Sequence, residues 1–290
     1  MTLEKQSGCK LNLLLNILRK RADGFHELET VIHPVAVFDA LSFTRTGSGI
    51  QLTCSEPSLP TDPRNLAYRA AELFLRAAKI KEGVRMHLEK KLPLAAGLGG
   101  GSANAAVTLL GLNELFGQPL APDKLQLIAA FLGSDVPFFL QCKPALATGR
   151  GEQVQQLDFF PALKGTVFLL IHPGFGIATS WAYQHLAFFP DALNGHSGRA
   201  RKLVSLLQAG DLHAAGREFY NSLEAPALHK YPLLGLFQEF LRANGAAATL
   251  MSGSGSTTFC VVPGQAAAES LVEKFRSRFG QTSWIALARV

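Results

Sequence analysis

The sequence predicts an α+β protein built from two domains. The chain of 290 residues is longer than one typical domain, and 48% hydrophobic with 17% charged residues suits a full globular core. Strand and helix patterns are mixed along its whole length. Residues 158–165 read as a boundary, so we expect one domain over residues 1–158 and another over residues 159–290.

In the first domain, apolar residues occupy alternate positions from Cys9 to Ile17, which is the period of a strand. Asp23-Gly24 then predicts a turn into a return strand. The expected strands are 9–18, 29–38, 40–44, 49–53, 84–89, 145–148 and 153–157, and the expected helices are 63–80, 102–116 and 123–132, with a helical turn near residue 137.

The second domain alternates strands with helices. Its expected strands are 166–172, 247–251, 257–262 and 283–289, and its expected helices are 180–186, 202–207, 212–223, 232–244 and 266–279. No internal repeat or low-complexity tract interrupts this order.

Charge and cysteine content narrow the class of protein. A net charge of +6 suits a small anionic substrate, and the basic residues form short groups without a nucleic-acid-binding motif, so no nucleic-acid partner is expected. No stretch reaches 18 apolar residues, so no membrane span is expected. Four scattered cysteines without metal-ligand spacing are typical of a reduced protein, and we expect a cytoplasmic location.

A glycine-rich segment is the strongest indication of function. Its glycines directly precede an apolar helical pattern, where backbone N–H groups can converge on an anion. The helix would add its unpaired N-terminal amides and positive dipole end, and phosphate is the natural occupant. The segment reads Pro93-Leu94-Ala95-Ala96-Gly97-Leu98-Gly99-Gly100-Gly101-Ser102-Ala103-Asn104.

Two familiar phosphate-binding patterns do not fit this segment. A P-loop requires Lys and Ser or Thr directly after its last glycine, whereas Gly101 is followed by Ser102-Ala103. The dinucleotide fingerprint lacks its third glycine, because Ser102 stands in that place. From the residues alone, a loop that only packs a helix against a sheet remains the alternative.

Two charged residues are candidates for chemistry. Lys10 and Asn12 project to the same side of their strand, roughly 6–7 Å apart, where a lysine suits a phosphate. The alternative is a solvated strand face. Asp135 follows Gly133 and precedes an apolar segment, where it could accept a proton from a substrate hydroxyl or act as a helix N-cap.

Two further loops are open to two interpretations. Phe25 and His26 directly follow the predicted turn. They are either an aromatic ring that caps the core next to a surface histidine, or part of a pocket that stacks a heterocyclic ring. The loop Ser252-Gly253-Ser254-Gly255-Ser256 is a flexible hairpin or a place where backbone closely approaches the glycine-rich segment or a ligand.

Taken together, these segments resemble the GHMP small-molecule kinases. The glycine-rich segment resembles the family's P-x-x-x-G-L-G motif, and residues 251–256 resemble its third motif. Three segments point to the branch that phosphorylates 4-diphosphocytidyl-2-C-methyl-D-erythritol. They are Lys10-Leu-Asn-Leu, Arg21-Ala-Asp-Gly-Phe-His26 and Gly133-Ser-Asp-Val-Pro137, so that the matches span residues 10 to 256.

The resemblance implies a fold, a reaction and a site. The expected fold is an N-terminal domain like domain 2 of ribosomal protein S5 and a ferredoxin-like C-terminal domain. The reaction is transfer of the ATP γ-phosphate to the 2-hydroxyl of the methylerythritol moiety, in the non-mevalonate isoprenoid pathway. Mg²⁺ would be held mainly by ATP, with Ser102 assisting and no other protein ligand assigned.

The resemblance also assigns roles to residues. Asp135 would be the base or hydroxyl-orienting acid, Lys10 its charged partner near the reacting oxygen, and Asn12 a substrate contact. His26 and Phe25 would hold the cytosine, with Tyr183 or Trp181 completing the pocket. The residues expected around the ATP phosphates are Leu94, Ala95, Ala96, Gly97, Leu98, Gly99, Gly100, Gly101, Ser102, Ala103 and Asn104.

Other functions remain as rivals. A homoserine or mevalonate-pathway kinase has no need of the base-recognition element that Asp-Gly-Phe-His26 suggests. A catalytically silent nucleotide-binding module would not need both Lys10 and Asp135. A Rossmann oxidoreductase is disfavoured by the missing glycine.

Overall fold

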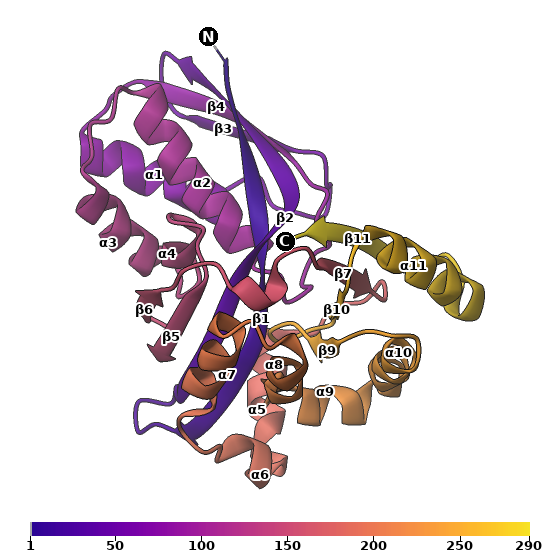
Figure 1. Ribbon diagram of the computed structural model, residues 1–290. Helices are drawn as coiled ribbons and strands as arrows, with labels where there is room; N and C mark the ends of the chain where they lie inside the picture. The colour runs from indigo at the N-terminus through magenta and orange to yellow at the C-terminus, as the bar shows by residue number, and fades with distance from the viewer. Residues whose placement is uncertain (1) are drawn as a thin grey trace. The chain divides into compact units, whose positions relative to one another are not determined.

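The computed structural model describes residues 2–290 (Figure 1). Contacts divide the chain into two compact units. Unit 1 comprises the segment ending at Cys9, Phe38–Leu92 and Gly99–Cys142, and unit 2 comprises Lys10–Val37, Pro93–Leu98 and Lys143–Val290. Two long strands, β1 (Thr2–Lys20) and β2 (His26–Thr46), contribute residues to both units.

Unit 1 combines strands with a group of helices. Its part of β2 pairs antiparallel with β4 (Gly83–Glu89), and β3 (Ile50–Cys54) runs parallel to β4. The helices are α1 (Leu66–Ala78), α2 (Gly100–Leu115), α3 (Pro122–Leu132) and α4 (Val136–Phe139). Helix α1 packs against α2 (Figure 1). A β-carbon on Gly111 of α2 would lie 2.6 Å from the ring of Phe43, so only glycine permits this approach of helix to strand.

Unit 2 contains a four-stranded antiparallel sheet in the order β11-β7-β10-β9. The strands are β7 (Val167–His172), β9 (Ala248–Met251), β10 (Thr258–Val262) and β11 (Trp284–Arg289). Buried residues of β7 and β10 form one core with α10 (Pro232–Ala243) and α11 (Gln265–Phe279), in which the rings of Phe237 and Phe275 meet edge to face at 4.8 Å.

Further short strands of unit 2 pair with its parts of β1 and β2. Strand β5 (Ala145–Gly149) pairs with β2 and with β6 (Gln153–Gln156), and β8 (Tyr220–Asn221) runs parallel to β1. The other helices are α5 (Thr179–His185), α6 (Pro190–Leu193), α7 (Arg199–Gln208), α8 (Leu212–Glu218) and α9 (Glu224–Lys230), with short 3₁₀ turns at Pro161–Leu163 and Leu186–Phe188.

The structure confirms the α+β class and most predicted elements, and it differs from the prediction at several places. The strands expected at 29–38 and 40–44 are one strand, because the intervening Asp39 is buried and hydrogen-bonded rather than a break. The helix expected at 212–223 ends at Glu218, because the next residues pair with β1. Helices α6 and α9 and strand β8 were not predicted. The division at residues 158 and 159 stays a prediction.

Candidate active site

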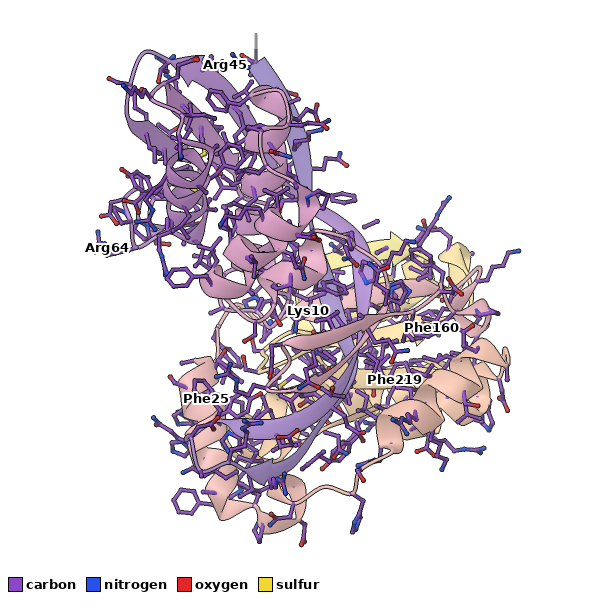
Figure 2. The ribbon with its side chains drawn as sticks, turned by 90° about the vertical axis from the view of Figure 1, so that its left-hand side faces the viewer. Lys10, Phe25, Arg45, Arg64, Phe160 and Phe219 are labelled. Carbon is purple, nitrogen blue, oxygen red and sulfur yellow. The ribbon has the colours of Figure 1, made fainter. Side chains whose placement is uncertain are left out.

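Lys10 (labelled in Figure 2) and Asn12 lie on β1 in unit 2. Both are buried, only 5% and 4% exposed. The Lys10 ammonium donates to Asn12 Oδ1, and Asn12 Nδ2 donates to Thr30 Oγ1 at 2.8 Å. The Thr30 hydroxyl in turn donates to the carbonyl of Leu14 at 2.6 Å. This chain of bonds fixes the Asn12 amide with its oxygen toward Lys10. The burial excludes the solvated strand face considered from the sequence.

The first half of the glycine-rich segment, residues 93–98, packs against the Ser252–Ser256 loop of unit 2. Gly97 has φ +76°, and a β-carbon on it would lie 2.0 Å from the carbonyl oxygen of Ser252. The Ser252 hydroxyl donates to the Gly97 carbonyl at 3.0 Å, and Thr257 N–H donates to the Ala96 carbonyl at 3.2 Å. Close backbone approach, one of the two interpretations of the Ser252–Ser256 loop, is therefore what the structure shows.

The second half of the segment opens helix α2 in unit 1. Gly99 is the N-cap residue, with φ +71°, and its carbonyl accepts the first helical bond, from Ala103 N–H at 2.9 Å. The cap supplies no side-chain hydrogen bond, and the first turn carries no acidic residue. The amides at this end and the positive end of the helix dipole therefore remain suited to an anion.

Two side chains hold the start of the Ser252–Ser256 loop. Asn221 Nδ2 donates to the carbonyls of Met251 at 2.8 Å and Gly253 at 2.7 Å. Glu224 Oε1 accepts from Met251 N–H at 2.7 Å and from Gln238 Nε2 at 2.5 Å. Burial raises the pKa of the Glu224 carboxyl. Both residues stabilise the loop that contacts Gly97.

The ring of His26 lies against the ring of Tyr183, with 5.0 Å between centroids and 41° between planes. Tyr183 comes from α5, as does Trp181, but Trp181 stacks on His185 at 4.3 Å and lies under the Lys230 ammonium. Burial lowers the pKa of His26. Of the two aromatic candidates, Tyr183 is the one that the structure places beside His26.

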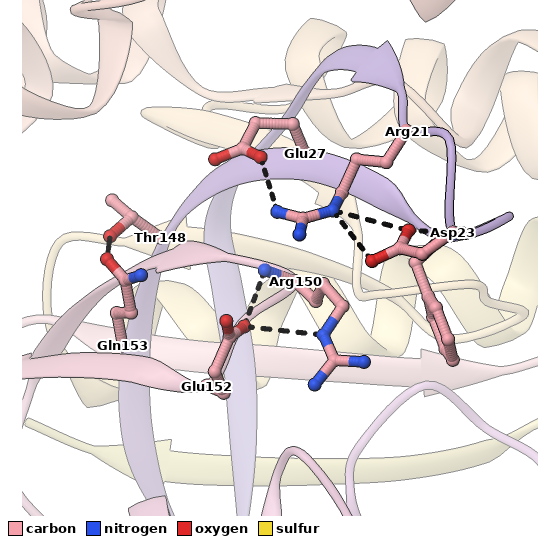
Figure 3. Close-up of polar contacts among 8 residues, drawn as sticks. Arg21, Asp23, Glu27, Thr148, Arg150, Glu152 and Gln153 are labelled. Atoms are coloured by element: carbon pink, nitrogen blue, oxygen red, sulfur yellow. Dashed lines mark hydrogen bonds and ion pairs between the residues drawn. The ribbon is translucent and has the colours of Figure 1, made fainter.

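The turn before His26 is held by charged contacts (Figure 3). The Arg21 guanidinium binds the carboxylates of Asp23 at 3.1 Å and Glu27 at 2.8 Å. Asp23 Oδ1 also accepts the Phe25 N–H at 3.1 Å. The Phe25 ring is 55% exposed, and the Arg150 guanidinium lies 4.7 Å from its centroid. The ring therefore stands at the surface of unit 2 rather than capping a core.

Asp135 directly precedes α4 in unit 1 and is partly buried. It occupies the N-cap position of that helix, as one of the two interpretations expected, but its side chain makes no capping hydrogen bond to the helix. Helix α4 packs against α2, whose first turn belongs to the glycine-rich segment and which lies in the same unit.

Comparisons with known proteins agree on one family. Residues 65–143 match the family "GHMP kinases N terminal domain" and residues 203–281 match "GHMP kinases C terminal". The chain is 42% identical to the 4-diphosphocytidyl-2-C-methyl-D-erythritol kinase of Synechococcus sp. (strain JA-3-3Ab), over 87% of this chain and 82% of that protein. With the enzyme of that name from Geobacter sulfurreducens it is 36% identical, over 98% and 96%.

The chain belongs to the 4-diphosphocytidyl-2-C-methyl-D-erythritol kinase family of GHMP kinases. A crystal structure of 4-(cytidine 5'-diphospho)-2C-methyl-D-erythritol kinase is 34% identical and has a TM-score of 0.83, covering 99% of this chain and 100% of that one. A homoserine kinase from Cytophaga hutchinsonii, 19% identical with a TM-score of 0.78, covers 100% of this chain and 95% of its own and shares the fold. The resemblance drawn from the sequence is confirmed.

Some of the residues described in this section gave no signal in the sequence. Thr30 orients Asn12, but a threonine in a strand is ordinary and its partner lies 18 positions away. Asn221 lies where a helix was expected and Glu224 directly follows that range, so their bonds to the Ser252–Ser256 loop were not predicted. For Glu224, the sequence offered one indication of a structural role, which is an acidic residue among apolar neighbours.

Proposed function

We propose that the protein transfers the γ-phosphate of ATP to the 2-hydroxyl of 4-diphosphocytidyl-2-C-methyl-D-erythritol, a step of the non-mevalonate isoprenoid pathway. The observation that carries this proposal is the pairing of His26 with Tyr183, 5.0 Å apart, in a chain whose relatives are named for that acceptor. A pair of rings supplies a stacking surface for a base, which homoserine or mevalonate would not use.

The proposed phosphate site is the glycine-rich segment. Gly97 and Gly99 adopt positive φ, and Gly99 opens α2 without a competing acidic residue in the first turn. Amides in this arrangement bind phosphate. The residues proposed to surround the ATP phosphates are those at positions 94–104.

Phosphoryl transfer requires positioning and charge neutralisation more than covalent chemistry by the protein. In the proposed mechanism, Asp135 orients the acceptor hydroxyl and takes its proton as the new phosphorus–oxygen bond forms. The bond between the γ-phosphorus and the β–γ bridging oxygen breaks, and ADP leaves with that oxygen. Lys10 supports the negative charge near the reacting oxygen, and Asn12, fixed by Thr30, holds both Lys10 and the acceptor. His26, Phe25 and Tyr183 hold the cytosine.

Magnesium fits this scheme as an ion that ATP brings. Among residues 2–290, no group of three or more His, Cys, Asp or Glu side chains could hold a metal ion. Mg²⁺ keeps several waters and is commonly bound by substrate phosphates with one or two protein groups. The Ser102 hydroxyl, in the first turn of α2, is the protein group proposed to assist. The bound ion would neutralise phosphate charge.

The proposed partners are small molecules. A net charge of +6 suits two anionic substrates, and we propose no nucleic-acid partner. The four widely spaced cysteines support a cytoplasmic location. In the part of the chain that the structure describes, no helix has the length and apolar character to cross a bilayer.

The test is a direct substrate comparison. Purified protein with Mg²⁺ and ATP is incubated separately with 4-diphosphocytidyl-2-C-methyl-D-erythritol, homoserine and mevalonate. The masses of the products are measured by mass spectrometry. We expect the mass of one phosphate to be added to the cytidyl compound alone. Phosphorylation of homoserine or mevalonate in its place would overturn the proposed acceptor.

A further inference from the structure

Asp39 is a charged residue in the interior of β2, and it is only 1% exposed. Its Oδ1 accepts the backbone N–H groups of Lys91 at 2.8 Å and Leu92 at 2.9 Å. Its Oδ2 accepts from Asn104 Nδ2 at 3.1 Å and from the Lys90 ammonium. All of these residues belong to unit 1. The carboxylate thus has four donors, which makes its burial tolerable.

The four donors lie at both ends of one segment. Lys91 and Leu92 immediately precede the glycine-rich residues, and Asn104 follows them in the first turns of α2. Asn104 is itself 3% exposed, and its Nδ2 also donates to Ser7 Oγ at 2.9 Å. The Asp39 carboxylate therefore holds residues 91 and 92, just before the segment 93–103, close to Asn104, just after it.

The start of α2 also lies close to this carboxylate. A β-carbon on Gly100 would be 3.5 Å from Lys90 Nζ and 3.8 Å from Asp39 Oδ2. The side chains of Asp39 and Lys90 are 0% and 6% exposed, so their ion pair is shielded from water. A pair shielded in this way has a defined geometry, and removing one partner leaves a buried charge without compensation.

We infer that Asp39 is a positioning residue for the proposed nucleotide-binding segment. It fixes the distance between the two ends of the segment and the direction in which α2 presents its N-terminal amides. The expected effect on substrates rests on the proposed function, and it concerns one of the two substrates. Loss of the tie should weaken the interaction with ATP and leave the cytidyl acceptor, proposed to bind at His26 and Tyr183, unaffected.

The principal variant is Asp39→Asn. The amide keeps Oδ1 for the two backbone N–H groups but turns an N–H₂ group toward Asn104 and Lys90, so donors oppose donors. We expect KM for ATP to rise about ten- to a hundred-fold, the range for losing a hydrogen bond to a charged group. We expect KM for the cytidyl acceptor to stay within about two-fold of the wild-type value. An equal rise of KM for both substrates would mean that the variant disturbs the whole fold.

Two further variants keep the test decisive. Asp39→Asn combined with Lys90→Met removes both charges together and guards against unfolding from an uncompensated ammonium. Glu29→Gln is the matched control: Glu29 is another buried carboxylate of β2, which accepts from Asn16 Nδ2 at 2.9 Å and from Gly198 N–H at 3.1 Å in unit 2. We expect the control to leave KM for ATP within about two-fold.

Backbone hydrogen exchange separates this inference from the proposed function. Amides in residues 93–103 should exchange faster in both Asp39 variants and at the wild-type rate in Glu29→Gln. The exchange is measured without substrate, so it reports on Asp39 even if the wild-type protein phosphorylates none of the acceptors. Unchanged exchange in a folded Asp39 variant, or an equal rise of both KM values, overturns the inference.

Discussion

Gly97 packs so closely against Ser252 that a β-carbon on it would lie 2.0 Å from the Ser252 carbonyl oxygen. The Ser252 hydroxyl returns a hydrogen bond to the Gly97 carbonyl at 3.0 Å, so the two backbones are held in contact. Two glycine-containing loops that are 155 residues apart in sequence thus share one interface in unit 2. The proposed phosphate segment depends on this interface for its shape.

The first prediction concerns Gly97→Ala. The methyl group would meet a backbone atom that no side-chain rotation can remove, at a φ of +76° that alanine also disfavours. We expect the rate of ATP-dependent phosphorylation to fall by at least about a hundred-fold, comparable to the loss of one pre-organised donor at a reacting group. Steady-state kinetics on folded protein measures this.

Gly174→Ala is the matched control for Gly97→Ala. Gly174 has φ +91°, and nothing lies within 4 Å of a β-carbon built on it, so this variant carries the backbone strain without the clash. We expect a stability loss of about 1 kcal/mol and nearly unchanged turnover. Equal loss of turnover in the two variants would show that strain, and not contact with Ser252, is responsible.

The second prediction concerns Tyr183→Leu, which removes a ring and keeps apolar bulk. If His26 and Tyr183 hold the cytosine, KM for the cytidyl acceptor should rise about five- to a hundred-fold, as expected for a lost stacking contact. KM for ATP should not change. Trp181→Leu is the control on the same helix, because Trp181 packs on His185 and not on His26. An acceptor KM that responds to Trp181→Leu and ignores Tyr183→Leu would reverse the assignment.

The third prediction concerns Asp135→Asn. If the carboxylate takes the proton of the acceptor hydroxyl, kcat should fall by about 10²–10⁴ while the acceptor still binds. Asp123→Asn changes an exposed acid in the first turn of α3, also in unit 1, and should leave kcat unaltered. A folded Asp135→Asn protein with near-normal kcat would remove Asp135 from the proposed role.

The parts of the fold that the sequence predicted are those governed by local periodicity. Helix α2 was expected from residue 102 and begins at Gly100, and β10 was expected at 257–262 and spans Thr258–Val262. Errors arose where a distant partner decides the outcome. The strands expected at 29–38 and 40–44 left out Asp39, whose donors at residues 90–92 are about fifty positions away. Aspartate is depleted in strands, so only these distant donors explain its place inside β2.

The candidate site was predictable to the extent that its motifs are contiguous. The glycine-rich segment, Lys10 with Asn12, and Phe25 with His26 could each be singled out from neighbouring residues. Asn221 could not, because its function depends on the parallel pairing of β8 with β1, which only the three-dimensional fold establishes. The choice of Tyr183 over Trp181 likewise required the direction in which α5 presents its rings.

The buried residue His33 makes the stability of the fold depend on pH. It is 2% exposed, and its ring lies 5.9 Å from Phe159, 6.0 Å from Phe160 and 5.4 Å from Phe168, measured between centroids. Nδ1 donates to the Pro34 carbonyl at 2.7 Å, whereas Nε2 is buried without a hydrogen-bond partner. Burial therefore lowers the pKa of His33 to about 4, because a second proton would have no acceptor.

The fourth prediction is the stability of His33→Phe as a function of pH. With a pKa of about 4 when folded and 6.5 when unfolded, the unfolded chain binds more protons between these values, so the unfolding free energy falls as pH drops. His33 should account for a loss of about 2 kcal/mol between pH 7 and pH 5. Phenylalanine suits the surrounding rings and cannot be protonated, so denaturant titrations should show a smaller loss for His33→Phe by that amount. Replacement of the exposed His213 by phenylalanine should leave the wild-type pH dependence in place, and parallel curves for the wild type and His33→Phe would show that His33 does not bind a proton on unfolding.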